Sequence, residues 1–304
     1  MNIIVGTRGS KLALRQTNWV ISQLKEKYPK HCYKIKMIRT TGDKIQNISL
    51  DKIGEKGVFV KEIEEQLLNG EIDLAVHSMK DMPGELPRGL MFSWTPRRED
   101  FRDALILNKG YQSLEDLPKG AIIATGSKRR ACQLLSIRED LNVISIRGNM
   151  DTRLRKMKEK NLDGIILAMA GLKRMGFSEI YKEQIQILSP QIMLPSPTQG
   201  ALGLEIREDN DKLHNLLECI RDDQSHLEII AERAFLKGIG GSCHIPMGAL
   251  CTIREKNLQI EGLLGNEDGT ILIRKKIYGD KNKAKDLGKQ LAKEILKEMK
   301  VNER

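Results

Sequence analysis

Strand-like and helix-like stretches alternate through the first two hundred residues of this chain. Short apolar runs of strand length are each followed by a longer stretch with apolar residues at helical spacing. This alternation is typical of βαβ units, in which parallel strands form a sheet covered by helices. We therefore predict an α/β fold with mainly parallel sheets. The predicted strands are residues 2–5, 33–38, 72–76, 104–107, 121–124, 143–146, 164–168 and 201–206.

The alternating pattern breaks twice. The first strand-helix series ends near residues 96–100, where a second series begins. Pro190, Pro195 and Pro197 then precede a strand of the kind that can return to the first series. A chain that crosses twice between two α/β units is expected to form a hinged molecule with a cleft. The expected lobes are residues 1–98 with 199–217, and residues 102–193.

The composition changes again near residue 222. A helix is expected near residues 226–236, followed by a glycine-rich loop, three strands and a final helix. In that last helix, apolar side chains recur at helical spacing while the lysines face away, as in a helix packed on a sheet. We predict a small α+β domain over residues 220–304. The three strands are residues 249–253, 258–264 and 271–277, and the apolar positions of the final helix are Leu287, Leu291, Ile295 and Met299.

The charge balance favours an anionic partner. The chain has 51 Lys and Arg against 41 Asp and Glu, a formal net charge of +10. Aromatic residues make up only 4% and the basic residues are scattered, which disfavours nucleic acid. No apolar run is long enough to span a bilayer, and the first residues lack the zones of a signal peptide. We expect a cytoplasmic monomer with no nucleic-acid or membrane partner.

The cysteines and histidines do not form a recognisable disulfide or metal pattern. Five cysteines without regular spacing fit a reducing compartment better than a disulfide framework. The five histidines make no His-x-x-x-His or Glu-x-x-His motif, so we predict no zinc or di-iron site.

A polar cluster follows the apolar run at residues 72–76. It brings His77, Lys80 and Asp81 together just before Pro83. In an open α/β sheet, loops at the carboxyl ends of strands line the ligand crevice, so these side chains are expected in a site. Asp81 is the candidate catalytic acid. The alternative is a solvated, salt-bridged loop.

Arginines also gather at the predicted strand-to-helix turns. Arg8 follows the first strand, Arg129 and Arg130 follow a later one, and Arg147 and Arg153 flank Gly-Asn. Helix N-termini and guanidinium groups both hold carboxylates or phosphates. Turns that converge in this way predict a ligand with several negative charges. The alternative is that some of these arginines only begin helices.

Cys243 lies in a loop with paired glycines. The sequence there is Gly-Gly-Ser-Cys-His-Ile-Pro, which would leave the thiol at a loop tip. Basic surroundings would lower its pKa and favour the nucleophilic thiolate. The alternative is a small buried side chain, as for the other four cysteines.

Several motifs of this chain, in their order and spacing, resemble the porphobilinogen deaminase family over nearly the whole length. The resemblance implies two lobes like those of periplasmic binding proteins and a C-terminal domain whose cysteine holds a covalent dipyrromethane. The matching segments are residues 7–14, 56–62, 77–81, 147–149, 167–172 and 199–201.

The resemblance also implies an activity in tetrapyrrole and haem biosynthesis. Family members deaminate four porphobilinogen units, join them head to tail, and release hydroxymethylbilane by hydrolysis. Loss of ammonia gives an azafulvene, whose positive charge a nearby carboxylate would stabilise. Asp81 matches that carboxylate and would also transfer protons. Cys243 matches the attachment residue.

Further roles follow position by position. The implied contacts to the cofactor are Lys80, Asp81, Thr125, Ser127, Arg129 and Arg130; those to the substrate are Arg8, Ser10, Arg147, Arg153 and Gln199; and the mobile loop over the site contains Lys52, Lys56 and Phe59. Gly126 and Ser242 depart from the commoner family pattern, so a hydroxyl contact at residue 126 is missing.

Three other functions remain open at this point. A two-lobed protein that only binds an anion would not need Asp81 or Cys243. A nucleic-acid binder would tolerate loss of Asp81 and bind in a salt-dependent way. A cysteine hydrolase would need a supporting histidine motif, and none is evident.

Overall fold

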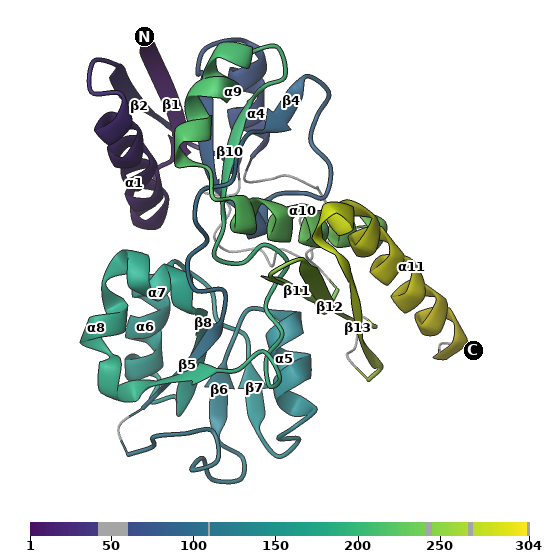
Figure 1. Ribbon diagram of the computed structural model, residues 1–304. Helices are drawn as coiled ribbons and strands as arrows, with labels where there is room; N and C mark the ends of the chain where they lie inside the picture. Colours follow the sequence, from purple (N-terminus) through teal and green to yellow (C-terminus); the bar gives the residue numbers. More distant parts are fainter. Residues whose placement is uncertain (42–59, 109, 241–244, 267–269, 303–304) are drawn as a thin grey trace.

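The computed structural model describes residues 1–41, 60–108, 110–240, 245–266 and 270–302. The described residues form three sheets, each with its own helices (Figure 1). Two of the sheets lie at opposite ends of the molecule, and the third lies to one side of the junction between them.

The sheet of the first lobe contains both ends of the first α/β series. Its strand order is β2-β1-β3-β10-β4. β1 runs parallel to β2 and β3, whereas β10 runs antiparallel to β3 and β4. The strands are β1 (Asn2–Arg8), β2 (Cys32–Ile38), β3 (Leu74–Ser78), β4 (Leu90–Phe92) and β10 (Leu202–Arg207), and the helical elements are α1 (Lys11–Lys27), α4 (Lys61–Leu68), η1 (Met79–Asp81), α9 (Asp211–Leu217) and η3 (Glu218–Ile220).

Helix α1 shows how the sequence builds this lobe. The Ser10 hydroxyl accepts a hydrogen bond from the Ala13 amide at 3.2 Å and caps the helix. Thr17, Ile21 and Leu24 are buried on the face toward the sheet. The helix therefore fixes the position of the turn that carries Arg8 and Ser10.

The second lobe repeats the arrangement. Its strand order is β7-β6-β8-β5-β9, in which β6 is parallel to β7 and β8, and β5 is antiparallel to β8 and β9. The strands are β5 (Asp103–Leu107), β6 (Ile122–Ala124), β7 (Asn142–Ile144), β8 (Gly164–Ala168) and β9 (Ile185–Leu188), and the helical elements are α5 (Lys128–Leu135), α6 (Met150–Glu159), α7 (Met169–Met175), α8 (Phe177–Ile180) and η2 (Lys182–Gln184).

The C-terminal part is an antiparallel sheet with helices packed on it. Residues Leu287, Leu291, Ile295 and Met299 are buried in its core, as the spacing predicted. The elements are α10 (Asp223–Gly238), β11 (Met247–Arg254), β12 (Asn257–Gly265), β13 (Leu272–Asp280), η4 (Lys281–Lys283) and α11 (Ala284–Asn302), with strand order β11-β12-β13. The expected fold class is thus confirmed: two α/β sheets with parallel strand pairs and an α+β part at the C-terminus.

Both antiparallel strands of the lobes, β5 and β10, are those that the chain enters directly after crossing between lobes. The short strands β4 and β9, which the sequence did not predict, pair with them at the sheet edges.

The buried carboxylate of Glu232 joins the two crossings to the C-terminal part. Arg98, on the outgoing crossing, donates to both of its oxygens at 2.7 and 3.0 Å. The Thr198 amide on the returning crossing donates at 2.5 Å, and the Cys251 amide of β11 donates at 2.8 Å. One side chain of α10 therefore fixes both connections between the lobes.

Candidate active site

The turn that follows β3 places Asp81 in a pocket of the first lobe. Asp81 ends η1 and is exposed, at the carboxyl end of a strand parallel to β1. A cavity of about 80 Å³ brings it together with Arg8, the last residue of β1, and with Ser10, the cap of α1. The other residues that line the cavity are Leu12, Ala13, Gln16, Val60, Val76, His77, Ser78 and Met82.

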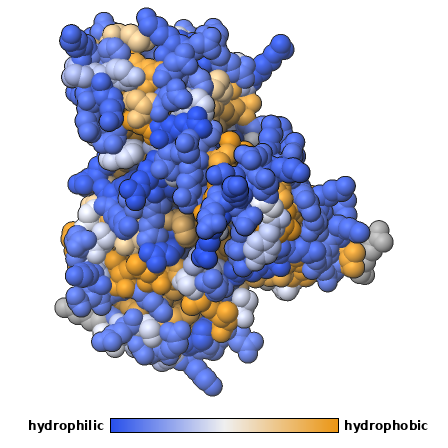
Figure 2. Space-filling model, in the orientation of Figure 1, coloured by the Kyte–Doolittle hydropathy of each residue, from blue (hydrophilic) through white to orange (hydrophobic). Residues whose placement is uncertain are grey.

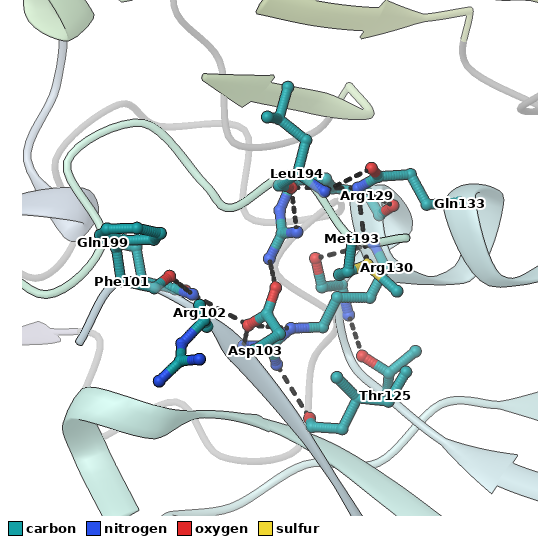
Figure 3. A network of polar contacts seen from close by, with 12 residues as sticks. Phe101, Arg102, Asp103, Thr125, Arg129, Arg130, Gln133, Met193, Leu194 and Gln199 are labelled. Atoms are coloured by element: carbon teal, nitrogen blue, oxygen red, sulfur yellow. Dashed lines mark hydrogen bonds and ion pairs between the residues drawn. The ribbon is translucent and has the colours of Figure 1, made fainter. Parts of the chain in front are cut away.

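In the second lobe, Arg129 and Arg130 lie side by side at the start of α5 and point at the carboxylate of Asp103 (Figure 3). Arg129 reaches one carboxylate oxygen at 2.8 Å, and Arg130 reaches the other with Nη2 at 2.7 Å and Nε at 3.1 Å. Burial alone would raise the pKa of Asp103, but the two guanidinium charges outweigh it and lower that pKa well below its usual range. The group keeps a net positive charge.

Two backbone carbonyls complete this arrangement. Arg129 donates to the Leu194 carbonyl at 2.6 Å, and Arg130 donates to the Ile166 carbonyl at 2.9 Å. The sequence predicted both arginines as site residues but did not reveal Asp103, which precedes the expected strand at residues 104–107. The structure therefore adds Asp103 as the residue that orients both guanidinium groups.

Gln199 bridges the two lobes next to this group. Its amide nitrogen donates to Asp103 at 2.9 Å and to the Phe101 carbonyl at 2.8 Å, and its amide oxygen accepts from Lys80 Nζ at 3.2 Å. Burial and the charge of Arg130 lower the pKa of Lys80 to about 8. The turn of the first lobe that holds Lys80 and Asp81 and the arginine pair of the second lobe thus belong to one network.

Thr125 and Ser127 hold the local backbone around the arginine pair. Thr125 Oγ1 accepts from the Ser127 amide at 3.2 Å, and Ser127 Oγ caps α5 by accepting from the Arg130 amide at 3.5 Å. At Gly126, a Cβ atom would lie 2.9 Å from the Ile146 carbonyl oxygen. The close approach of the two backbone segments favours glycine at that position.

Arg153 and Arg147 approach the same region from the start of α6. Arg153 donates to the Gly148 carbonyl at 2.7 Å. Burial lowers its pKa, and the charges of Arg130 and Arg147 lower it further, while Asp81 opposes the shift. Arg153 therefore lies within electrostatic range of both the arginine pair and the candidate acid. Figure 2 shows that hydrophilic residues also gather on the surface where the two lobes meet.

A buried acidic group beneath the pocket was not predicted. His77 Nε2 lies 2.8 Å from Glu205 Oε2, with both side chains buried. Glu64 of α4 is 8% exposed, and burial together with the charge of Glu205 raises its pKa to about 7, against the opposing charge of His77. Gln16, also missed, donates to Ser78 Oγ at 2.9 Å. Glu205 and Gln16 contact β3, the strand that leads into the turn that holds Asp81.

Four of the expected site residues lie outside the described residues. They are Cys243, Lys52, Lys56 and Phe59. Their roles therefore remain predictions.

Two family models match the chain. One, described as the dipyromethane cofactor binding domain of porphobilinogen deaminase, covers residues 3–215, and one for the C-terminal domain of that enzyme covers residues 226–297. The chain belongs to the porphobilinogen deaminase family. Members of this family build the tetrapyrrole skeleton as transferases on a dipyrromethane cofactor, so the expected family, activity and cofactor are confirmed.

Curated porphobilinogen deaminases match nearly end to end. That of Clostridium novyi is 55% identical over 98% of this chain and 100% of its own length. That of Clostridioides difficile is 52% identical over 98% of both chains, and that of Bacillus pumilus is 48% identical over 96% and 93%.

Solved structures match at low identity. The Bacillus subtilis ytmK protein, a probable amino-acid ABC transporter extracellular-binding protein, gives a TM-score of 0.40 at 13% identity, over 72% of this chain and 89% of that chain. A Bordetella pertussis BvgS VFT2 domain gives a TM-score of 0.44 at 13% identity, over 72% and 86%. Among helices of the described ranges, none has the length and apolar composition to cross a bilayer.

The donor groups of the site fit a dipyrromethane that carries acetate and propionate groups. A guanidinium has several N–H donors in a planar fork, and the contacts to Asp103, Leu194 and Ile166 engage only part of those of Arg129 and Arg130. Lys80 uses one of its ammonium donors on Gln199. The site therefore offers oriented cationic donors of the kind that hold carboxylates.

Proposed function

We propose that Asp81 is the carboxylate that drives the condensation of porphobilinogen in this chain. The observation that carries the proposal is its place in the pocket with Arg8 and Ser10, within electrostatic range of Lys80 and Arg153. Cationic groups on both sides of an exposed carboxylate suit a substrate with two carboxylates and an amine. A non-catalytic anion binder would need the cations but not the acid.

The proposed chemistry assigns Asp81 to two moments of each condensation. First, the aminomethyl carbon–nitrogen bond of the substrate breaks: the protonated amine leaves as ammonia with the bonding electron pair, and positive charge develops on the pyrrole ring. The Asp81 carboxylate stabilises that charge. The exocyclic carbon then bonds to a free pyrrole carbon, which gives up its proton, and Asp81 accepts it. When bound, dipyrromethane supplies the first free pyrrole carbon.

The cationic residues are proposed to hold the carboxylates of the pyrrole rings. Lys80, Arg129 and Arg130, with the hydroxyls of Thr125 and Ser127, support the cofactor side, because they form one interconnected network. The proposed substrate-side contacts are Arg8, Ser10, Arg147, Arg153 and Gln199. In this arrangement Gln199 acts mainly through Lys80 and Asp103, which it joins.

We further propose that Cys243 is the attachment residue and that Lys52, Lys56 and Phe59 belong to a loop over the site. Residues 1–98 with 199–217, 102–193 and 220–304 are proposed as the three domains, a division supported by the strand content of the three sheets. The irregular cysteine spacing supports a reducing compartment, and we propose a cytoplasmic monomer, which light scattering would test.

Intact mass under denaturing conditions, with peptide mapping around Cys243, tests the attachment. An adduct of two linked pyrrole units on Cys243 supports it, and Cys243→Ala should carry none. If wild-type protein forms no adduct even after incubation with porphobilinogen, the attachment proposal is wrong.

Asp81→Asn tests the catalytic role, because it removes charge but keeps shape. The variant should retain the adduct yet lose turnover by roughly 10²- to 10⁴-fold, the usual contribution of a positioned acid or base. Asp209→Asn, a change at a highly exposed carboxylate of the same lobe, is the matched control and should be neutral. Near-normal turnover by Asp81→Asn would contradict the catalytic role of Asp81 and favour another acid.

A further inference from the structure

Helix α10 of the C-terminal part packs along the catalytic turn of the first lobe. In Figure 1 this helix lies at the centre of the molecule, between the first lobe and the third sheet. Ile229 of α10 forms a small buried apolar cluster with Met79, the first residue of η1, and with Ala201 of the returning crossing. Phe92 of β4 packs against the same cluster.

One turn further along α10, Arg233 forms hydrogen bonds to the backbone just after Asp81. Its Nη2 donates to the carbonyl of Pro83 at 2.9 Å and to that of Gly84 at 3.2 Å. Its guanidinium lies 4.5 Å from the centre of the Phe92 ring, a cation–π contact. Burial lowers the pKa of Arg233 to about 10, with Glu205 as the opposing charge, so the side chain stays cationic at neutral pH.

The next turn of the helix continues the same contact face. A Cβ atom on Gly84 would lie 3.3 Å from the Lys237 Cα, so the turn approaches the helix backbone closely. Lys237 also pairs with Glu85 at 2.8 Å. Residues 229, 233 and 237 are spaced four apart and lie on one face of α10. This face therefore runs along the segment that begins at Met79 and ends at Glu85.

We propose that Arg233 is a positioning residue for Asp81: it holds the carbonyls that follow the acid and so fixes the catalytic turn against α10. The proposal rests on the proposed role of Asp81. Arg233 is suited to this work because a guanidinium can hold two carbonyls at once, and its plane can also stack on a ring. Apolar packing at Ile229 fixes the start of the turn, and Arg233 fixes its end.

The consequence concerns more than local rigidity. Helix α10 ends at Gly238, and Cys243 follows it in the sequence. The turn that carries the acid packs on α10, and the segment that carries the proposed attachment residue follows the same helix in the sequence.

The test compares Arg233→Met and Arg233→Lys with wild type. Methionine keeps an apolar stem but removes every donor to Pro83 and Gly84, whereas lysine keeps the charge and can still donate. Since displacement of a catalytic group by about 1 Å can cost roughly 100-fold, we expect Arg233→Met to lower kcat by about 10- to 100-fold with little change in KM. Arg233→Lys should recover part of that loss.

Turnover is expressed per molecule that carries the pyrrole adduct, counted by intact mass, so that poor folding does not mimic slow catalysis. Arg221→Met is the matched control, because Arg221 also stacks on an aromatic ring, 4.1 Å from the Trp94 centroid, and its ion pairs with Glu218 and Asp223 lie away from the turn. Its kcat should stay near wild type.

A double-mutant comparison separates this proposal from the one on which it rests. If Arg233 acts through Asp81, Arg233→Met should cost little in a chain that already has Asp81→Asn, because the group to be positioned is gone. If Asp81→Asn is inactive but Arg233→Met costs the full factor in both backgrounds, the positioning role is overturned while the role of Asp81 stands. If Asp81→Asn alone is nearly normal, the earlier assignment fails. A wild-type kcat in both Arg233 variants also overturns the inference.

Discussion

Replacement of Glu64 by glutamine should change the pH dependence of stability. The carboxyl is 8% exposed, and burial next to the charge of Glu205 raises its pKa from 4.5 to about 7. Between these values the unfolded chain has released the proton while the folded chain still holds it. Stability therefore falls as pH rises through this window and levels off above the folded pKa.

The size of the effect follows from that shift. A carboxyl whose pKa rises by roughly 2.5 on folding destabilises the folded state by up to about 3 kcal/mol above pH 7, because each pKa unit corresponds to about 1.4 kcal/mol. Glutamine is neutral in both states and avoids this loss. Glu64→Gln should thus match wild type near pH 4, below the unfolded pKa, and unfold at higher urea concentration near pH 8.

Urea unfolding followed by circular dichroism measures the difference at both pH values. Glu65→Gln is the matched control, since Glu65 neighbours Glu64 on α4 and is exposed. Its free energy of unfolding should stay within about 0.5 kcal/mol of wild type at either pH. An advantage of Glu64→Gln that is equal at both pH values would refute the reasoning, because a packing gain does not depend on proton release.

Two other changes test the connections between the lobes. Arg98→Met leaves the Glu232 carboxylate buried without its guanidinium and should lower the free energy of unfolding by about 3–5 kcal/mol in thermal melts. The control Arg155→Met, at an exposed pair with Glu159, should change it by under about 1 kcal/mol. Similar effects for the two variants would contradict the role of the Arg98–Glu232 pair in joining the lobes. Gly200→Ala would place a Cβ atom against the Glu99 carbonyl oxygen, at a residue with a φ of +92°. It should lower the melting temperature much more than Gly120→Ala, because Gly120 has a similar φ of +77° but open space around it. Equal decreases for the two variants would show that the collision costs little free energy.

Much of the fold follows from local periodicity. Apolar runs and helical spacing located most of the strands, because burial of one face imposes the pattern on the residues themselves. The direction of β5 and β10 does not follow from such patterns. A strand of either direction shows the same run of buried residues, and its direction here depends on where the chain enters the sheet after crossing between lobes.

In the candidate site, too, some residues could be predicted from local sequence and others depend on distant parts of the chain. Arginines at strand-to-helix turns could be located because a turn's position follows from the elements around it, and Arg129 and Arg130 do meet at one place. Asp103 could not be found in this way, because its partners are 26 and 27 residues away in sequence. An acidic residue directly before the apolar run Ala-Leu-Ile-Leu, within the same buried strand, was the available signal.

Glu232 is a fixed point about which the two lobes can rotate. Both chain crossings and β11 are hydrogen-bonded to this one carboxylate, so the lobes cannot move straight apart without breaking several buried contacts at once. Rotation about this point strains them least. Room for a lengthening oligopyrrole would therefore be created by rotation of the lobes about Glu232, while the C-terminal part stays in place.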